Sequence, residues 1–148
     1  MKKYLFTMVL GLFLIGCASV SPEQGVERIV EVDTSKSETF DKSLDWAARF
    51  YVDSKSVIEV KDAERGRIIG RGVLIISSSM GMREDLYAYT LQIDVKEDKA
   101  RIKMNNIRPY AGKGGVSDPS YFEEEILEKM NSVAESFATA LTADDDSW

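Results

Sequence analysis

Histidine is absent from the 148-residue sequence, and cysteine occurs once, at Cys17. Without histidine, the chain lacks the most common general base and the most common metal ligand of proteins. A single cysteine cannot form a disulfide within the chain, even in an oxidising compartment. If Cys17 carries lipid, as argued below, no thiol remains as a nucleophile. We therefore predict that the protein is not an enzyme and that it has no catalytic residues, no metal site and no cofactor.

A surplus of basic residues is also missing, because the formal net charge is −6. Loss of Lys2 and Lys3 with a leader peptide takes it to −8. Nucleic acid requires clustered Lys and Arg, and anionic lipid requires a basic patch. The charge balance disfavours both, so we predict no nucleic-acid partner and no basic patch.

Part of the acidic surplus lies at Asp144, Asp145 and Asp146. We interpret residues 143–148 as a solvated acidic tail. The alternative is a weak calcium site, but the glycine and the spaced ligands of a calcium loop are missing.

No apolar run is long enough to cross a bilayer well. Tyr4–Ile15 is nearly all apolar, but as a helix it would rise about 18 Å, well short of a hydrocarbon core of ~30 Å. Because Lys2 and Lys3 precede it, the run is typical of a secretory signal peptide.

The run ends in Leu14-Ile15-Gly16-Cys17, which resembles the bacterial lipobox. The resemblance implies that residues 1–16 are a signal peptide, cut between Gly16 and Cys17, and that the Cys17 thiol carries lipid. Two or three acyl chains hold a protein stably, whereas one gives marginal binding. The alternative is an ordinary residue in an ordinary signal peptide. With Ala18 after the cysteine, the expected place is the outer membrane, facing the periplasm of a bacterial envelope.

The mature chain is long enough for one domain with its own core. Residues 17–25 are polar and predict a lipidated tether, and residues 26–142 are expected to form a single domain. Val26–Val32, rich in valine and isoleucine, predicts a strand. A helix is expected over about Ser37–Val52, and the residues predicted to face the core are Phe40, Leu44, Ala47, Ala48 and Tyr51.

Four extended segments follow that helix. Val57–Val60 is short, with Ile58 and Val60 expected on one face. Arg67–Ser77 is strand-like, and its glycines at 70 and 72 suggest a bulge or bend. Clean alternation over Leu86–Val95 and again over residues 100–105, with a short polar turn between them, predicts a hairpin with one wet face.

A second helix is the surest element. Asp118 and Pro119 are typical of an N-cap and a first helical position, and three glutamates follow where the helix dipole favours negative charge. Apolar residues recur at steps of three and four: Phe122, Ile126, Met130, Val133, Phe137 and Leu141. The order β-α-β-β-β-β-α predicts an α+β fold, an antiparallel sheet of about five strands with both helices on one face.

Several of these features resemble one bacterial family: the element order, Trp46, the run Val57-Ile58-Glu59-Val60-Lys61-Asp62 and the run Gly66-Arg67-Ile68-Ile69-Gly70-Arg71-Gly72. It is a family of exported domains of unknown function with a TATA-binding-protein-like (TBP-like) fold, and the likeness spans roughly Val26–Leu141. The resemblance implies that fold and transfers no activity, because fold does not imply function.

Other patterns that could carry chemistry are weak. Ser77, with the two serines after it, has no lysine at a fixed spacing, and a strand end is the simpler interpretation. Glu84 and Asp85 could form a carboxylate pair, but on a wet surface such pairs are usually solvated. The glycines at 112, 114 and 115 lack the Gly-Lys-Ser/Thr of a phosphate-binding loop.

Two functions remain, a binding module for an envelope protein or component, and a carrier of a small apolar ligand or lipid. The carrier needs a pocket between helices and sheet, lined by bulky residues that otherwise fill the core. The binding module would use the wet sheet face, with Arg101 and Lys103, or the edge formed by Trp46 and Phe50. Trp46 is expected to be partly exposed, against either the last helix or a partner outside the domain.

Overall fold

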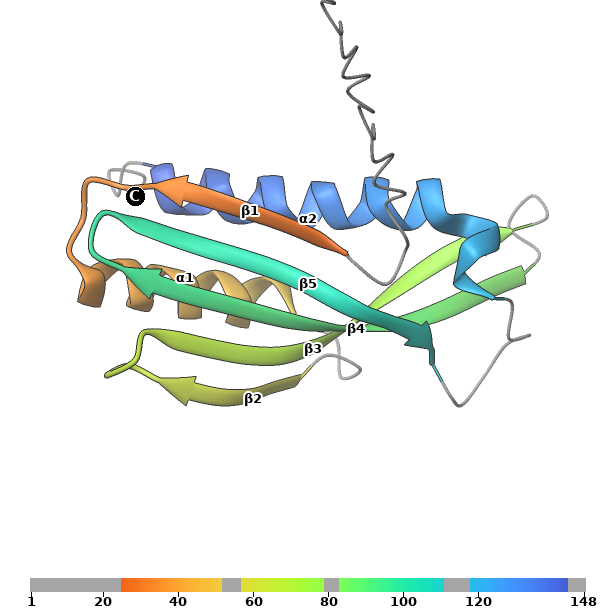
Figure 1. The fold of residues 1–148 in the computed structure, drawn as a ribbon, viewed down its shortest axis with the longest axis horizontal. Helices are drawn as coiled ribbons and strands as arrows, with labels where there is room; N and C mark the ends of the chain where they lie inside the picture. The colour runs from red at the N-terminus through yellow and green to blue at the C-terminus, as the bar shows by residue number, and fades with distance from the viewer. Residues whose placement is uncertain (1–24, 52–56, 79–82, 111–117, 144–148) are drawn as a thin grey trace, which may run out of the picture.

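The computed structural model describes residues 25–51, 57–78, 83–110 and 118–143. Within these ranges a five-stranded antiparallel sheet carries two α-helices on one face (Figure 1). The elements are β1 (Val26–Glu31), α1 (Lys36–Phe50), β2 (Val57–Asp62), β3 (Arg67–Ser78), β4 (Arg83–Lys96), β5 (Lys99–Pro109), the 3-10 helix η2 (Pro119–Phe122) and α2 (Glu123–Thr142). The predicted class, element order and strand number are confirmed.

The strands lie in the order β1-β5-β4-β3-β2, so that the first strand is added at the edge beside the last one. The predicted hairpin is the pair β4–β5, in which Ile93 lies opposite Ile102. Its turn is closed by Asp98, whose φ of 61° lies in the left-handed region that aspartate tolerates better than most residues.

The core lies between the sheet and the helices. Alternate residues of the central strands point into it, as predicted for the hairpin. The fully buried or nearly buried strand residues include Ile68, Leu74, Ile76, Tyr89, Leu91, Ile93, Val95, Ala100, Ile102 and Met104. The residues between them face away from the helices, and we call that side the open face.

The start and the facing of α2 agree with the sequence. Asp118 accepts a hydrogen bond from the Ser120 backbone N–H at 2.9 Å, and Pro119 begins η2, which leads directly into α2. The buried residues of α2 are Ile126, Met130, Val133, Ala134, Phe137 and Leu141. The predicted stripe is confirmed, with Phe122 half-buried at its start.

The buried face of α1 differs from the prediction. Ala48 is exposed, whereas Trp46 is only 6% exposed and Thr39 and Ser43 are buried. On a wheel with Phe40 at zero and ~100° per residue, the buried residues therefore span about −120° to 0°, and the partly buried Leu44 extends the arc to about +40°. The expectation that Trp46 is partly exposed is wrong.

Two polar residues explain the shift of that arc. The Thr39 hydroxyl donates to the Ser35 carbonyl at 2.9 Å, and the Ser43 hydroxyl donates to the Thr39 carbonyl at 2.7 Å. Because both hydroxyls are bonded within the helix, these small side chains can be buried at little cost. The helix turns this small face inward and packs against α2 as well as the sheet.

The facing of β2 also differs. A register shift between Ile58 and Val60 leaves Glu59 as an extra residue in the pairing with β3. A bulge of this kind moves the following side chain to the other face of the sheet. Ile58 packs against the core, but Val60 lies opposite Ile69 on the open face and is 42% exposed.

Gly72 of β3 marks close packing more than a bend. The β3–β4 register runs without a shift through Gly70 and Gly72, so the predicted irregularity lies across from them, in β2. A Cβ on Gly72 would lie 2.2 Å from the Tyr89 ring. Glycine is therefore required here to make room for Tyr89.

Several predictions lie outside the described residues. They concern the signal peptide, the lipobox and most of the tether, the glycine loop at 111–117 and the tail from 144 on.

Phe137 tests the facing of α2. Its side chain is fully buried against the Trp46 ring, so Phe137→Ala should lower the free energy of unfolding by ~3–5 kcal/mol. Glu124→Ala, an exposed change in the same helix, is the control. Equal denaturation midpoints for the two variants in a denaturant titration would show that the helix facing is misassigned.

Candidate functional site

The four residues proposed as a binding surface lie on two sides of the sheet. Trp46 and Phe50 belong to α1, in the helical layer, while Arg101 and Lys103 point from β5 to the open face. The structure therefore does not bring the two pairs together.

Trp46 holds the two helices together. Its ring meets the Phe137 ring of α2 edge-on, with 5.0 Å between the ring centroids. Its indole N–H donates to the Ser136 hydroxyl at 3.2 Å. The Phe50 ring stacks on the Trp46 ring, with 5.1 Å between the ring centroids, and Phe50 is 42% exposed. Of the two partners considered for Trp46, the neighbouring helix is the one observed.

A pair of tyrosine hydroxyls joins α1 to the sheet. Tyr51 and Tyr89 lie 2.7 Å apart, oxygen to oxygen. Burial raises the pKa of Tyr51, and the nearby Tyr89 raises it further. Burial also raises the pKa of Tyr89, although its bond to Tyr51 works the other way. Both groups stay neutral at physiological pH, so the pair supports the fold and supplies no ionised nucleophile.

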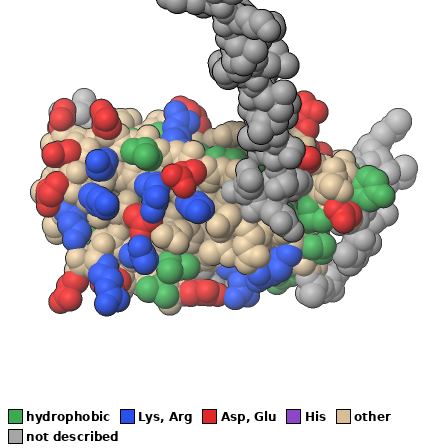
Figure 2. Space-filling model, viewed as in Figure 1, with side chains coloured by type: hydrophobic (Ala, Val, Ile, Leu, Met, Phe, Trp, Pro, Cys, Tyr) green, Lys and Arg blue, Asp and Glu red, His purple; other side chains and the backbone are tan. Residues whose placement is uncertain are grey.

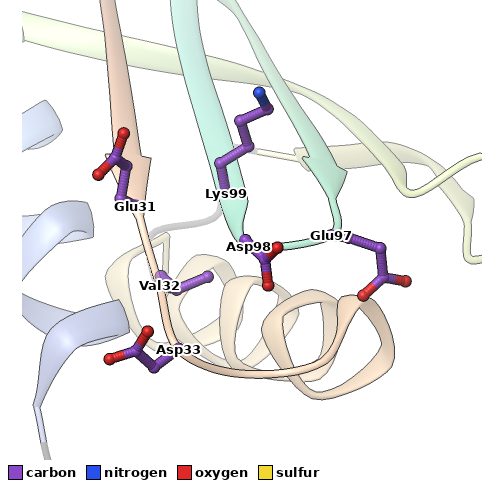
Figure 3. Close-up of a pocket in the computed structure, with 6 residues that line it drawn as sticks. All are labelled: Glu31, Val32, Asp33, Glu97, Asp98 and Lys99. Carbon is purple, nitrogen blue, oxygen red and sulfur yellow. The ribbon is translucent and has the colours of Figure 1, made fainter.

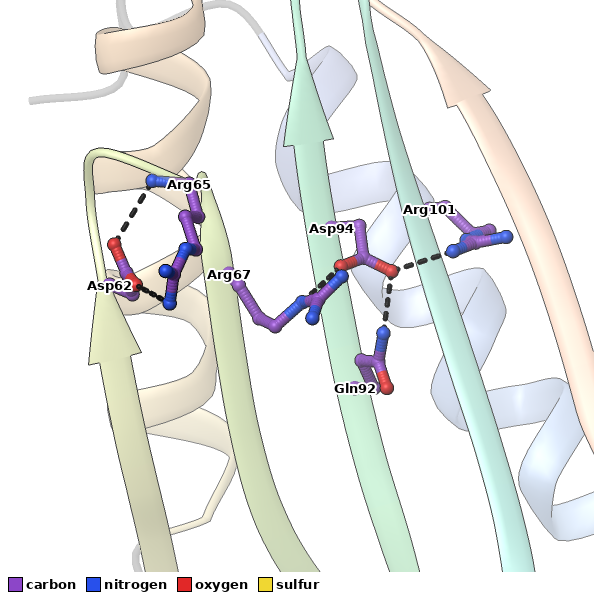
Figure 4. A network of polar contacts seen from close by, with 6 residues as sticks. All are labelled: Asp62, Arg65, Arg67, Gln92, Asp94 and Arg101. Carbon is purple, nitrogen blue, oxygen red and sulfur yellow. Dashed lines mark hydrogen bonds and ion pairs between the residues drawn. The ribbon is translucent and has the colours of Figure 1, made fainter.

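The open face carries a network of polar contacts centred on Asp94 of β4 (Figure 4). Arg67 of β3 and Arg101 of β5 reach it from the two neighbouring strands, each at 2.7 Å, and Gln92 donates to it at 2.8 Å. The Asp94 side chain is 12% exposed, whereas the two arginine side chains are nearly half exposed. The carboxylate thus fixes two guanidinium groups, and the Arg101 guanidinium also lies 3.8 Å from the Glu27 carboxylate.

Two opposing effects act on the pKa of Asp94. Partial burial raises it, but the hydrogen bonds from Arg101, Arg67 and Gln92 together lower it below its usual value. Asp94 is therefore ionised at neutral pH, and the network keeps its geometry there.

Basic side chains gather along the centre of this face (Figure 2). By strand alternation, the three central strands present these cations on it: Lys96, Lys99, Arg101, Lys103 and Arg108, with Arg67 and Arg71 from β3. We call them the basic stripe. The net charge of the chain predicted no basic patch, and that prediction is wrong for the central strands, because most acids of this face lie on the edge strands β1 and β2 and many others on α1 and α2.

The open face also carries exposed apolar residues. In the described ranges five large hydrophobic side chains are exposed, and three of them lie here: Ile29 at 60%, Val60 at 42% and Ile75 at 38%. They come from β1, β2 and β3. Within the described residues no helix covers them, since α1 and α2 lie behind the sheet (Figure 1).

Other sequence candidates are not brought together into a site. Asp85 is buried on the core side of β4 while Glu84 is exposed, so the prediction of a solvated pair is wrong. A hollow at one end of the sheet is lined by Glu31, Val32, Asp33, Glu97, Asp98 and Lys99, but their carboxylates point in different directions (Figure 3).

Two negative findings apply to the described ranges. Among these residues, no group of three or more Asp, Glu, Cys or His is arranged to hold a metal ion. No described helix is long and apolar enough to cross a membrane.

Part of the open face was visible in the sequence and part was not. Lys99, Arg101 and Lys103 alternate with buried residues, a pattern that could have indicated a basic strand face. Val60 and Arg108 could not be placed, because each follows an irregularity that no simple alternation predicts.

Comparison with solved structures gives the same fold. A DUF4468 family protein from Bacteroides ovatus ATCC 8483 matches with a TM-score of 0.65 and 15% identity, over 83% of this chain and 88% of that one. A TBP-like protein from Parabacteroides distasonis ATCC 8503 matches with a TM-score of 0.61 and 19% identity, over 80% of this chain and 93% of that one. No functionally curated protein matches the sequence.

At the level of sequence, residues 27–110 match the family described as "Domain of unknown function (DUF4468) with TBP-like fold". This match covers β1 to β5 and α1, and with them the whole basic stripe. The resemblance noted in the sequence is thereby confirmed for the TBP-like fold and the family of unknown function, and the chain belongs to the DUF4468 family of domains with a TBP-like fold.

Proposed function

We propose that this chain is a lipid-anchored, non-catalytic binding module of the bacterial cell envelope that contacts its partner through the open sheet face. The observation that carries the proposal is the composition of this face. Exposed apolar side chains and a basic stripe lie together on the side of the sheet that α1 and α2 leave free.

The anchor is supported by the lipobox-like Leu14–Cys17 after a short apolar run. From Cys17 to the start of β1 at Val26 the chain has nine residue steps, which span at most ~30 Å when fully extended. A tether of this length would hold the domain close to the membrane. The expected membrane is the outer membrane, with the domain on its periplasmic side.

A binding role is supported by the mixture on the open face. The solvated sheet face of a monomeric domain usually carries polar residues. Apolar side chains grouped on such a face indicate contact with another molecule. Ile75 lies in such a group, beside the half-buried Val73 on β3 and opposite Leu86 on β4, whereas Ile29 and Val60 are exposed on the two edge strands. The cations beside them add specificity and faster association more than affinity.

A non-catalytic role is supported by the chemistry present. The sequence has no histidine. Four acids of the open face are held in ion pairs with arginine: Glu27, Glu59, Asp62 and Asp94.

The alternative, a carrier for a small apolar ligand, has less support. Its pocket would be lined by Phe40, Phe122, Met130 and Phe137. Phe40, Met130 and Phe137 belong to the buried core cluster, and the Phe137 ring contacts Trp46 at 5.0 Å. These contacts favour a filled core, since protein interiors are close-packed.

Anchoring can be tested at one residue. Cys17→Ser should abolish metabolic labelling by a fatty-acid probe and leave the precursor uncut, because serine offers no thiol to carry lipid. Phe50→Ser, a distant change to serine, serves as the control and should label normally. Labelling that persists in Cys17→Ser would remove the anchor from the account.

The binding face can be tested by photo-crosslinking in the native host. A benzophenone amino acid at Ile29 or Ile75 should form adducts in the intact envelope, because these side chains point outward from the open face. The matched positions are Ala48 and Lys129, which are exposed on α1 and α2. Adducts that form equally well from Ala48 and Lys129 would contradict a role for the open face.

A further inference from the structure

We propose that the open face binds a single extended, acidic segment of a partner protein, laid along β5. This inference rests on the proposed function, since it names the chemistry of the partner that the same face would take. It follows from the layout of charge and apolar surface across the five strands.

Charge on the open face is divided between the centre and the edges. The central strands carry the seven cations of the basic stripe against two carboxylates, Asp94 and Glu84. The edge strands show the reverse. Their charged residues on this face are acidic: Glu27 and Glu31 on β1, and Glu59 and Asp62 on β2.

This division selects the shape of the partner. Neighbouring strands lie ~4.8 Å apart, so the three central strands form a basic strip only about 10 Å wide. A flat anionic membrane would meet the acidic edges together with the centre and would be repelled there. A single narrow acidic chain can lie on the strip and meets fewer like charges than a flat surface does, although Glu27 and Glu31 of β1 lie opposite Lys103 and Lys99 of β5.

The spacing along β5 suits an extended chain. Lys99, Arg101 and Lys103 follow each other at two-residue steps, which correspond to about 7 Å in a strand. The bulge at Asn106, whose φ is 56°, returns Arg108 to the same face. An extended peptide repeats its own side chains at the same step, so carboxylates at alternate positions would meet these cations one by one.

Two kinds of cation are available to such a peptide. Arg101 and Arg67 are held in place by Asp94, and a partner carboxylate would meet guanidinium groups that are already oriented. Lys103 and Arg108 form no ion pair within the described residues, so a ligand need not displace a carboxylate from either of them.

Apolar residues at the Arg108 end of the strip favour a peptide over a glycan or a nucleic acid. On β3, Val73 is half-buried and Ile75 is 38% exposed on the open face, and Leu86 lies opposite Ile75 on β4. An acidic peptide with an apolar residue among the side chains that face the sheet can cover these residues, whereas a chain of phosphates or sugar acids offers little apolar surface.

The inference can be tested by fluorescence anisotropy on the full mature chain carrying Cys17→Ser. The probe is a labelled ten-residue peptide with Glu and Val at alternate positions. It should bind, and its affinity should fall about tenfold in Lys103→Glu/Arg108→Glu and fall again with added salt, which screens exposed charges. Lys103→Gln/Arg108→Gln, the milder variant, should show a smaller loss if the first variant unfolds.

The control variant is Arg49→Glu/Lys129→Glu, which makes the same charge change on the helical side and should bind the peptide like the parent. A peptide with Gln in place of Glu should not bind. Equal binding of the Gln peptide, or an affinity unchanged by both Lys103/Arg108 variants, overturns the inference. Vesicles of phosphatidylcholine and phosphatidylglycerol are a second probe. If they bind through Lys103 and Arg108 and the peptide does not, the strip is a membrane-binding surface and the inference is overturned. Crosslinks from Ile29 and Ile75 without peptide binding would leave the proposed function standing and remove this inference alone.

Discussion

Burial of one sheet face beneath α1 and α2 is the constraint on which the rest of the structure depends. Its centre is the contact of Trp46 with Phe137, which joins the two helices above the buried strand residues. Large aromatic side chains contribute much of the apolar area that stabilises a core of this size. Because side chains alternate along a strand, every residue turned into this core fixes the direction of its neighbours. The charge pattern of the open face is therefore a consequence of core packing.

Two bulges refine that pattern. The extra residue Glu59 turns Val60 outward, and the bulge at Asn106 turns Arg108 outward. Without them both side chains would point toward the helices, where an arginine would lose its hydration without a partner. The bulges thus add one apolar and one basic side chain to the open face. Bulges frequently re-aim side chains in this way near functional surfaces.

Regular patterns in the sequence predicted the fold well. Strict alternation placed the β4–β5 hairpin, and steps of three and four placed the buried side of α2. The facing of α1 was not predictable from hydrophobicity, since Thr39 and Ser43 are polar residues whose hydroxyls are bonded within the helix. Trp46 was misplaced for the same reason, because the true arc is centred on a smaller and more polar side of the helix. The basic stripe was hidden by the net charge, which averages over a sheet face and two acidic helices.

The central claim is that the open face is the surface in contact with a partner in the envelope. Hydroxyl-radical footprinting with mass spectrometry tests it most directly, by comparing the protein in intact envelopes with the purified protein. The account predicts that oxidation of Ile29, Val60 and Ile75 falls severalfold in the envelope, while that of Phe50 and Tyr121, which are also exposed but lie off this face, stays the same. Protection of Phe50 and Tyr121 with unchanged oxidation of the other three would contradict it.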